Sequence, residues 1–149
     1  MLLKSIRILV PISLAAVVYI NYLAAQGAIG GITPEVISDK YPTYLTPAGY
    51  AFSIWGLIYL GMLLFSIYQL FKSDSENLDK IRVFFIGSCL ANIAWIFSWH
   101  NQKLAMSVVA MLTLLSSLVL ININGAKLLG NSDTWLVRIP FSIYFGWVS

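Results

Sequence analysis

The sequence predicts an all-α integral membrane protein, a single domain over residues 1–149 built as a bundle of five transmembrane helices, the fifth of them incomplete. Three observations predict this class. The chain is 59% hydrophobic and only 10% charged, whereas a soluble domain carries roughly a quarter charged residues. Its mean hydropathy is +0.82. Apolar stretches long enough to cross a bilayer recur along the chain, separated by more polar segments.

Four apolar windows predict complete spans. A transmembrane helix needs about 20 predominantly apolar residues. The second window contains no Asp, Glu, Lys or Arg along its whole length, so its 24 residues could cross a bilayer. We therefore expect membrane-spanning helices over Ile8–Ala25, Ala48–Phe71, Val83–Trp99 and Leu104–Ile123.

A fifth apolar window runs from Trp135 to Ser149, with Arg138 in its first turn. This window is too short to cross a bilayer upright, and no polar flank follows it. We therefore expect the sequence to be an amino-terminal fragment of a longer chain.

The placement of the basic residues predicts the orientation. Cytoplasmic loops of membrane proteins carry an excess of Lys and Arg. With the amino terminus in the cytoplasm, only Lys40 and Lys103 lie outside. The long segment Gln26–Pro47 then lies outside as well. The basic residues predicted to lie inside are Lys4, Arg7, Lys72, Lys80, Arg82, Lys127 and Arg138.

The first span has a second interpretation. Two basic residues, an apolar stretch and the small residues Ala24 and Ala25 resemble a secretory signal peptide with its cleavage site. The apolar stretch is long for such a peptide, and Tyr19, Asn21 and Tyr22 interrupt it. A retained helix is the better prediction.

The third span contains a polar residue, Asn92, near its middle. An amide that faced lipid would leave hydrogen-bonding groups unpaired, so Asn92 should face the bundle interior. Ser88, Asn92, Trp95 and Trp99 follow helical spacing and share this face. The amide either joins helices or lines a pocket, and the residue by itself favours the first reading.

Aromatic residues also share one face of the second span, where Phe52, Trp55 and Tyr59 follow helical spacing. Such a face either lines a pocket for a flat apolar ligand or packs against neighbouring helices. The preceding loop Gly27–Pro47 is long for a helix connection, and its glycines and prolines predict that the loop is not a regular helix. A lid over a site and a flexible linker are equally compatible with it.

Several classes of function are disfavoured. No run of basic residues predicts a nucleic-acid partner. No acidic or basic residue lies in the middle of a predicted span, so a proton relay or ion-coupled pump is not expected. The lone histidine, His100, lies at the edge of the third span and is expected at the interface. The lone cysteine, Cys89, is expected to act as a small hydrophobic residue. No catalytic or metal-binding pattern is present in the sequence.

Three segments carry a resemblance to a known family. Thr46–Tyr50, continuing through Trp55 and Tyr59, is similar to the Pro-Pro-Gly, Val-Phe, Val-Trp, Leu-Tyr run of the TspO/MBR family. Its members are the tryptophan-rich sensory proteins related to the mitochondrial translocator protein. Asn92–Trp95 resembles the family's Asn-x-x-Trp motif, and the ending Tyr144 to Ser149 is similar to its Pro-Tyr-x-x-Trp-Val-Ser segment. The chain looks closer to the longer members, which carry extra helices after the fifth.

The resemblance implies a five-helix bundle with an interior pocket near the first loop. Family members bind flat apolar ligands, chiefly porphyrins, and they are often dimeric. The ligand-binding residues implied for this chain are Trp55, Tyr59, Asn92, Trp95 and Trp147, with Pro47, Gly49 and Tyr50 in the lid.

The resulting hypothesis is a sensor or carrier in a bacterial inner membrane that binds a porphyrin or a haem-like tetrapyrrole and requires no cofactor. Two alternatives stay open. One is an enzyme that degrades a bound porphyrin, and the other is a structural membrane subunit without a small-molecule ligand.

Overall fold

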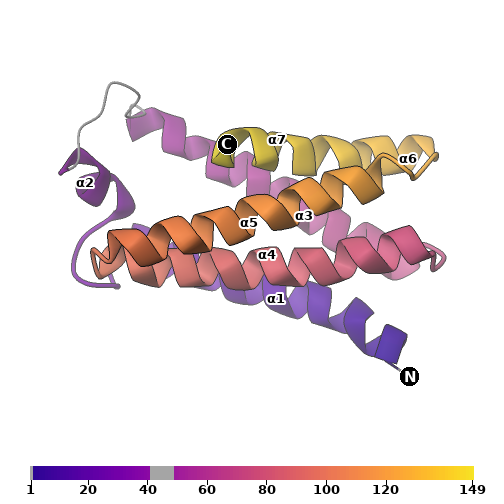
Figure 1. Ribbon diagram of the computed structural model, residues 1–149, viewed down its shortest axis with the longest axis horizontal. Helices are drawn as coiled ribbons and strands as arrows, with labels where there is room; N and C mark the ends of the chain where they lie inside the picture. Colours follow the sequence, from indigo (N-terminus) through magenta and orange to yellow (C-terminus); the bar gives the residue numbers. More distant parts are fainter. Residues whose placement is uncertain (1, 41–48) are drawn as a thin grey trace.

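Five helical segments run side by side along the long axis of the bundle in the computed structural model (Figure 1). The structure describes residues 2–40 and 49–149. Four of the segments are single helices, and the fifth joins α6, a π-helical turn (η2) and α7 without interruption. Their bounds are α1 Leu2–Ala25, α3 Ile54–Phe71, α4 Glu76–His100, α5 Leu104–Gly125, α6 Asn131–Asp133, η2 Thr134–Arg138 and α7 Ile139–Val148.

Two short helices lie at one end of the bundle, which is called the α2 end below. They are α2, Pro34–Asp39, and the 3-10 helix η1, Gly49–Ser53. Pro34 is the first residue of α2, where its missing N–H leaves no hydrogen bond unmade. Within the loop Gly27–Pro47, which the sequence predicts not to be a regular helix as a whole, these six residues form one short helix.

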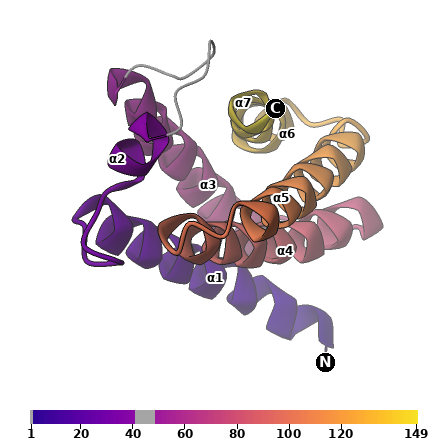
Figure 2. The same cartoon turned by 60° about the vertical axis from the view of Figure 1, so that its left-hand side comes forward.

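Helix contacts follow a closed ring. In order around the bundle, α1 packs against α3, α3 against α7, α7 against α5, α5 against α4, and α4 against α1. Figure 2 shows α7 between α3 and α5, with α1 on the far side of the bundle from α7. Side chains from α1 and α7 nevertheless belong to one hydrophobic core.

The expected all-α membrane bundle is confirmed, with corrections to two spans. Among the described residues, four helices are long and apolar enough to cross a membrane: Ile6–Ala25, Ile54–Phe71, Glu76–His100 and Leu104–Gly125. The second α-helix begins later than Ala48 because the chain first forms η1, and tight 3-10 turns are frequent at helix starts. The fifth segment is helical from Asn131 to Val148, but none of its helices reaches the length of a span.

The third span begins at Glu76 and not at Val83, for a local reason. The side-chain oxygen of Ser75 accepts a hydrogen bond from the backbone N–H of Leu78 at 3.3 Å. This cap satisfies one of the free N–H groups of the first turn. Glu76 and Asp79 add negative charge where the helix dipole is positive.

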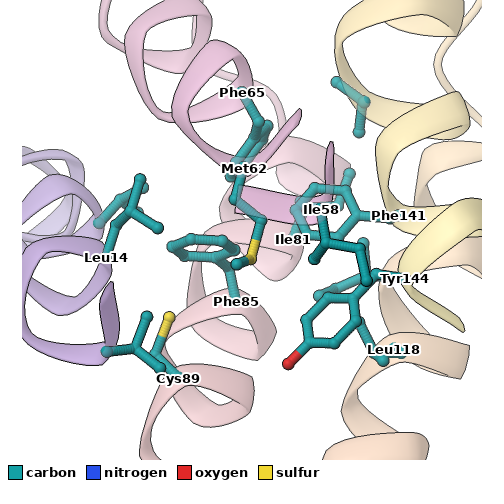
Figure 3. Close-up of a cluster of buried hydrophobic side chains, with 14 of the residues drawn as sticks. Leu14, Ile58, Met62, Phe65, Ile81, Phe85, Cys89, Leu118, Phe141 and Tyr144 are labelled. Atoms are coloured by element: carbon teal, nitrogen blue, oxygen red, sulfur yellow. The ribbon is translucent and has the colours of Figure 1, made fainter. Parts of the chain in front are cut away.

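The hydrophobic core joins α1, α3, α4, α5 and α7. At its centre, the rings of Phe65, Phe85 and Phe141 contact one another with centroids 5.0–5.8 Å apart. Figure 3 shows Leu14 and Cys89 on one side of this cluster and Tyr144 on the other. Cys89 is 2% exposed within the core, as expected for a thiol that packs as a small hydrophobic residue.

A charged network closes the end opposite α2. Arg82 of α4 is fully buried, although the sequence placed it on the flank of a span. Its guanidinium donates to Asp74 and Asp79 at 2.6 Å and to the side chain of Gln69 at 2.8 Å. Arg7 of α1 donates to the same Asp74 carboxylate at 2.6 Å. Because the carboxylates compensate its positive charge, Arg82 can be buried near the start of α4. The network links α1, α3 and α4.

A close contact between α3 and α7 depends on Gly61. A Cβ placed on Gly61 would lie 2.8 Å from the Cβ of Pro140, closer than packed carbon atoms approach. We expect Gly61→Ala to destabilise the bundle by about 1–3 kcal/mol, because the two helices must move apart. Thermal unfolding in detergent micelles measures the effect.

The matched control is Gly146→Ala in α7, where an added Cβ meets nothing within 4 Å. This control should leave stability unchanged or slightly higher, since alanine is the better helix former. Equal unfolding temperatures for the two variants would contradict the close contact.

Candidate functional site

A cavity of about 270 Å³ lies at the α2 end, between α1, α2, α3 and α4. Its wall is mainly apolar and aromatic, with a few polar groups, which is typical of small-molecule sites. The lining residues are Val18, Asn21, Tyr22, Ala25, Pro34, Glu35, Trp55, Gly56, Tyr59, Trp95 and Ile96.

A second cavity of about 200 Å³ adjoins the first. Pro34, Trp55 and Trp95 line both cavities, so the two indoles form part of the wall between them. The other lining residues of the second cavity are Ser38, Trp99, Met111, Trp147 and Val148. Four of the five tryptophans of the chain thus face one or both cavities.

Trp55 is the centre of an aromatic cluster. Its ring stacks on Tyr59 at 5.7 Å and meets Tyr144 edge-on, also at 5.7 Å. Trp147 lies edge-on to it at 6.4 Å. Offset and edge-on ring pairs of this kind hold each other in orientation. These rings pack α3 against α7. Trp55, Tyr59 and Trp147 also line the cavities, so the same residues serve both roles.

Asn92 is buried at 1% exposure, so the expectation that it faces the interior is confirmed. Its side-chain oxygen accepts a hydrogen bond from the amide of Asn21 at 2.7 Å. Its own amide donates to the hydroxyl of Tyr144 at 3.0 Å. Asn92 thus joins α1, α4 and α7 and lines neither cavity. The amide that lines the larger cavity belongs to Asn21.

Asn21 and Glu35 are site residues that the sequence analysis missed. The reasoning that directed Asn92 inward applies equally to Asn21, an amide within the first span. The sequence around Glu35 does not predict that this residue lines a cavity, because only the packing of α2 against the bundle brings it there. It contacts the cavity from the first turn of α2 and is half-buried.

Tyr59 lines the larger cavity, but its hydroxyl is not exposed there. The hydroxyl is buried and has no hydrogen-bond partner among the described residues. A buried hydroxyl without a partner costs free energy, so such groups are uncommon.

The predicted lid residues lie in different surroundings. Gly49 and Tyr50 belong to η1, and Tyr50 is 83% exposed and lines neither cavity. Pro47 lies outside the described residues. Within the described part of the chain, α2 is the element of the long loop that covers the cavities, through Pro34 and Glu35.

His100 is buried at 5% exposure rather than lying at an open interface. Its Nδ1 lies 2.9 Å from the carbonyl oxygen of Ile96, and its Nε2 has no partner among the described residues. The backbone of Gly30 packs against it, so the loop after α1 covers the end of α4. In the described ranges, no three His, Cys, Asp or Glu residues lie close enough to hold a metal ion.

A larger groove of about 580 Å³ lies between α4 and α5. Its wall contains no aromatic residue, and Leu90 and Val109 on its rim are more than 60% exposed. A groove of this kind on the outside of a bundle is where lipid chains lie. The two aromatic cavities, which combine rings with a few polar groups, are the better candidate site.

The fold and the site define a helical membrane protein with a tryptophan-lined interior cavity. The sequence pattern of the family described as TSPO-like protein matches residues 7–149. The chain therefore belongs to the TSPO-like family, and it is an integral membrane protein. No curated protein and no solved structure matches it significantly.

The hydrogen bond between Asn92 and Tyr144 leads to a prediction. Tyr144→Phe removes the hydroxyl and leaves the buried Asn92 amide without this acceptor. We expect a loss of about 1–2 kcal/mol in stability, within the range for an interhelical hydrogen bond in a membrane protein. Thermal unfolding in micelles measures it, with Tyr19→Phe, a change on the exposed face of α1, as the control.

If the bond exists, Tyr144→Phe combined with Asn92→Ala should cost less than the sum of the single changes. Strict additivity would contradict it.

Proposed function

We propose that the chain is a membrane sensor or carrier that encloses a flat apolar ligand, such as a porphyrin or another tetrapyrrole, between its aromatic helix faces. The observation that supports this proposal most is the position of Trp55 and Trp95, which line both cavities. Ring faces offer large stacking area at low entropic cost. Family membership agrees with a sensor or carrier of this type.

The size of the cavities bears on how such a ligand would fit. Ligand sites commonly measure about 300–1,000 Å³, and each cavity by itself falls below that range. A tetrapyrrole would therefore occupy both, which requires Trp55 or Trp95 to rotate out of the wall between them. Contacts with the ligand would then replace the contacts that the rotated indole loses.

The proposed arrangement in the membrane follows from the charge distribution. The amino terminus would lie in the cytoplasm of a bacterial inner membrane, with the α2 end facing outward. Ligand would then reach the cavities from the outer side, past α2. A homodimer is compatible with this arrangement.

Titration of the purified protein with protoporphyrin IX tests the proposal. Four tryptophans around the cavities make fluorescence quenching a direct readout. Saturable quenching with a stoichiometry of one ligand per chain supports the binding function. Absence of saturable binding for any tetrapyrrole favours the structural alternative, and turnover of the bound pigment that depends on a specific side chain favours the enzyme.

A further inference from the structure

The larger cavity contains one charged side chain among the described residues, and that side chain is acidic. Glu35 lines the cavity, and no Lys or Arg lines either cavity. Glu35 forms no ion pair within the described part of the chain. The segment 41–48, outside the described residues, carries no charged residue in its sequence, so it adds no cation.

The basic residues lie elsewhere. Arg7, Lys72 and Arg82 are held in ion pairs at the opposite end of the bundle. At the α2 end, Lys40 follows α2 and Lys103 precedes α5. Both are exposed and line neither cavity. A negatively charged ligand group within the cavity would therefore meet Glu35 without a compensating cation.

The uncharged polar side chain of Asn21 also lines the cavity. Both amide hydrogens of Asn21 have acceptors, the oxygens of Val17 and Asn92 at 2.8 and 2.7 Å. Its side-chain oxygen accepts no hydrogen bond in the described residues and stays free as an acceptor. Apart from Asn21 and Glu35, the wall is mainly apolar and aromatic.

We infer that this cavity selects uncharged or cationic ligands over carboxylates, with Glu35 as the selectivity residue and Asn21 as the uncharged polar contact. This inference rests on the proposed function, that a small molecule occupies the cavity, and it names the chemical class. The ligand is a flat apolar molecule with a hydrogen-bond donor for Asn21 and without free carboxylates in the cavity. Among tetrapyrroles, the esterified forms fit this description better than the free acids.

The physical basis is the cost of burying like charges. A carboxylate that enters an apolar cavity loses its hydration, and it needs a cation or several donors to replace the water. Here the nearest charged group repels it, at a separation where the effective dielectric constant is well below that of water. Esterification removes the charge and keeps the ring.

The test compares protoporphyrin IX with its dimethyl ester, each titrated against wild-type protein and Glu35→Gln in lipid nanodiscs. The two compounds partition differently into lipid, so the informative quantity is the ratio of their dissociation constants in each protein. Replacing Glu35 by its uncharged isostere should improve binding of the acid relative to the ester by about tenfold. The control is Asp39→Asn, which removes a negative charge from an exposed position of the same helix α2 and should leave the ratio unchanged.

The outcomes separate this inference from the proposed function. Saturable binding with an unchanged ratio in Glu35→Gln overturns the inference and leaves the binding function intact. An equal change in Asp39→Asn also overturns it, since the effect would then come from the general field of α2. Absence of saturable binding for both compounds overturns the proposed function and the inference together.

Discussion

Replacing Trp55 by alanine is expected to weaken tetrapyrrole binding about 30-fold, corresponding to roughly 2 kcal/mol, the effect of a central aromatic residue. Trp55 contributes wall to both cavities and contacts three other rings, Tyr59, Tyr144 and Trp147. Its loss removes a stacking surface and loosens the neighbouring rings. Tryptophan quenching or a ligand absorbance shift measures the affinity.

Two further variants separate binding from folding. Trp55→Phe keeps a smaller ring and should lose less affinity than the alanine variant. Trp135→Ala removes an indole that is 64% exposed and lines neither cavity, so it controls for the loss of one tryptophan from the fluorescence signal. Unchanged affinity in both Trp55→Phe and Trp147→Phe would show that the ligand lies elsewhere.

Replacing Arg82 by methionine is expected to destabilise the bundle by about 2–3 kcal/mol. The side chain of Arg82 is completely buried, and Gln69 beside it is buried as well. Removal of the guanidinium leaves the Gln69 side-chain oxygen and backbone carbonyl without their donor. Asp74 and Asp79 retain partial access to water, which keeps the cost below that of a fully buried ion pair. Thermal unfolding in micelles should show a decrease of several degrees.

The matched control is Lys80→Met, which removes a basic residue from the same helix. Lys80 pairs with Glu76 on the surface, and exposed pairs contribute about 0–1 kcal/mol. Similar losses for the two variants would contradict the role assigned to burial.

The same network has a pH dependence with a defined sign. Hydrogen bonds from Arg82 and then Arg7 lower the pKa of Asp74 below its ordinary value. A carboxyl whose pKa is lowered by folding stabilises the protein at pH values above its unfolded pKa, and this contribution is lost as the pH falls through the folded pKa. Arg82→Met should therefore reduce the acid sensitivity of the unfolding temperature between about pH 5 and 3.

Much of the architecture could be predicted from composition and periodicity. A run of apolar residues has few alternatives in a bilayer, because backbone N–H and C=O groups must pair within the helix. The four spans follow from this rule. The ends of the helices could not be predicted in this way. The start of the third span depends on the Ser75 cap and on the carboxylates that accept hydrogen bonds from Arg82. From the sequence, Arg82 is expected on the flank of a span, and only its carboxylate partners explain why it is buried.

The candidate site could also be predicted only in part. The cost of exposing an amide to lipid predicts that Asn92 faces the interior, and Asn92 is buried. Its partners, Asn21 and Tyr144, are separated from it by 71 and 52 residues along the chain. No local pattern links residues so far apart. The helix ring brings them together, and only that arrangement shows which amide faces the cavity.

The sequence by itself determined that this chain is a helical membrane protein, because hydrophobic length and the placement of charge are local properties. It also identified the aromatic residues from which a site would be built. The tertiary structure decided which of them meet, and it placed Glu35 of α2 against the cavity. The physical reason is that a cavity is made of gaps between helices that are distant in sequence, and packing alone sets those gaps.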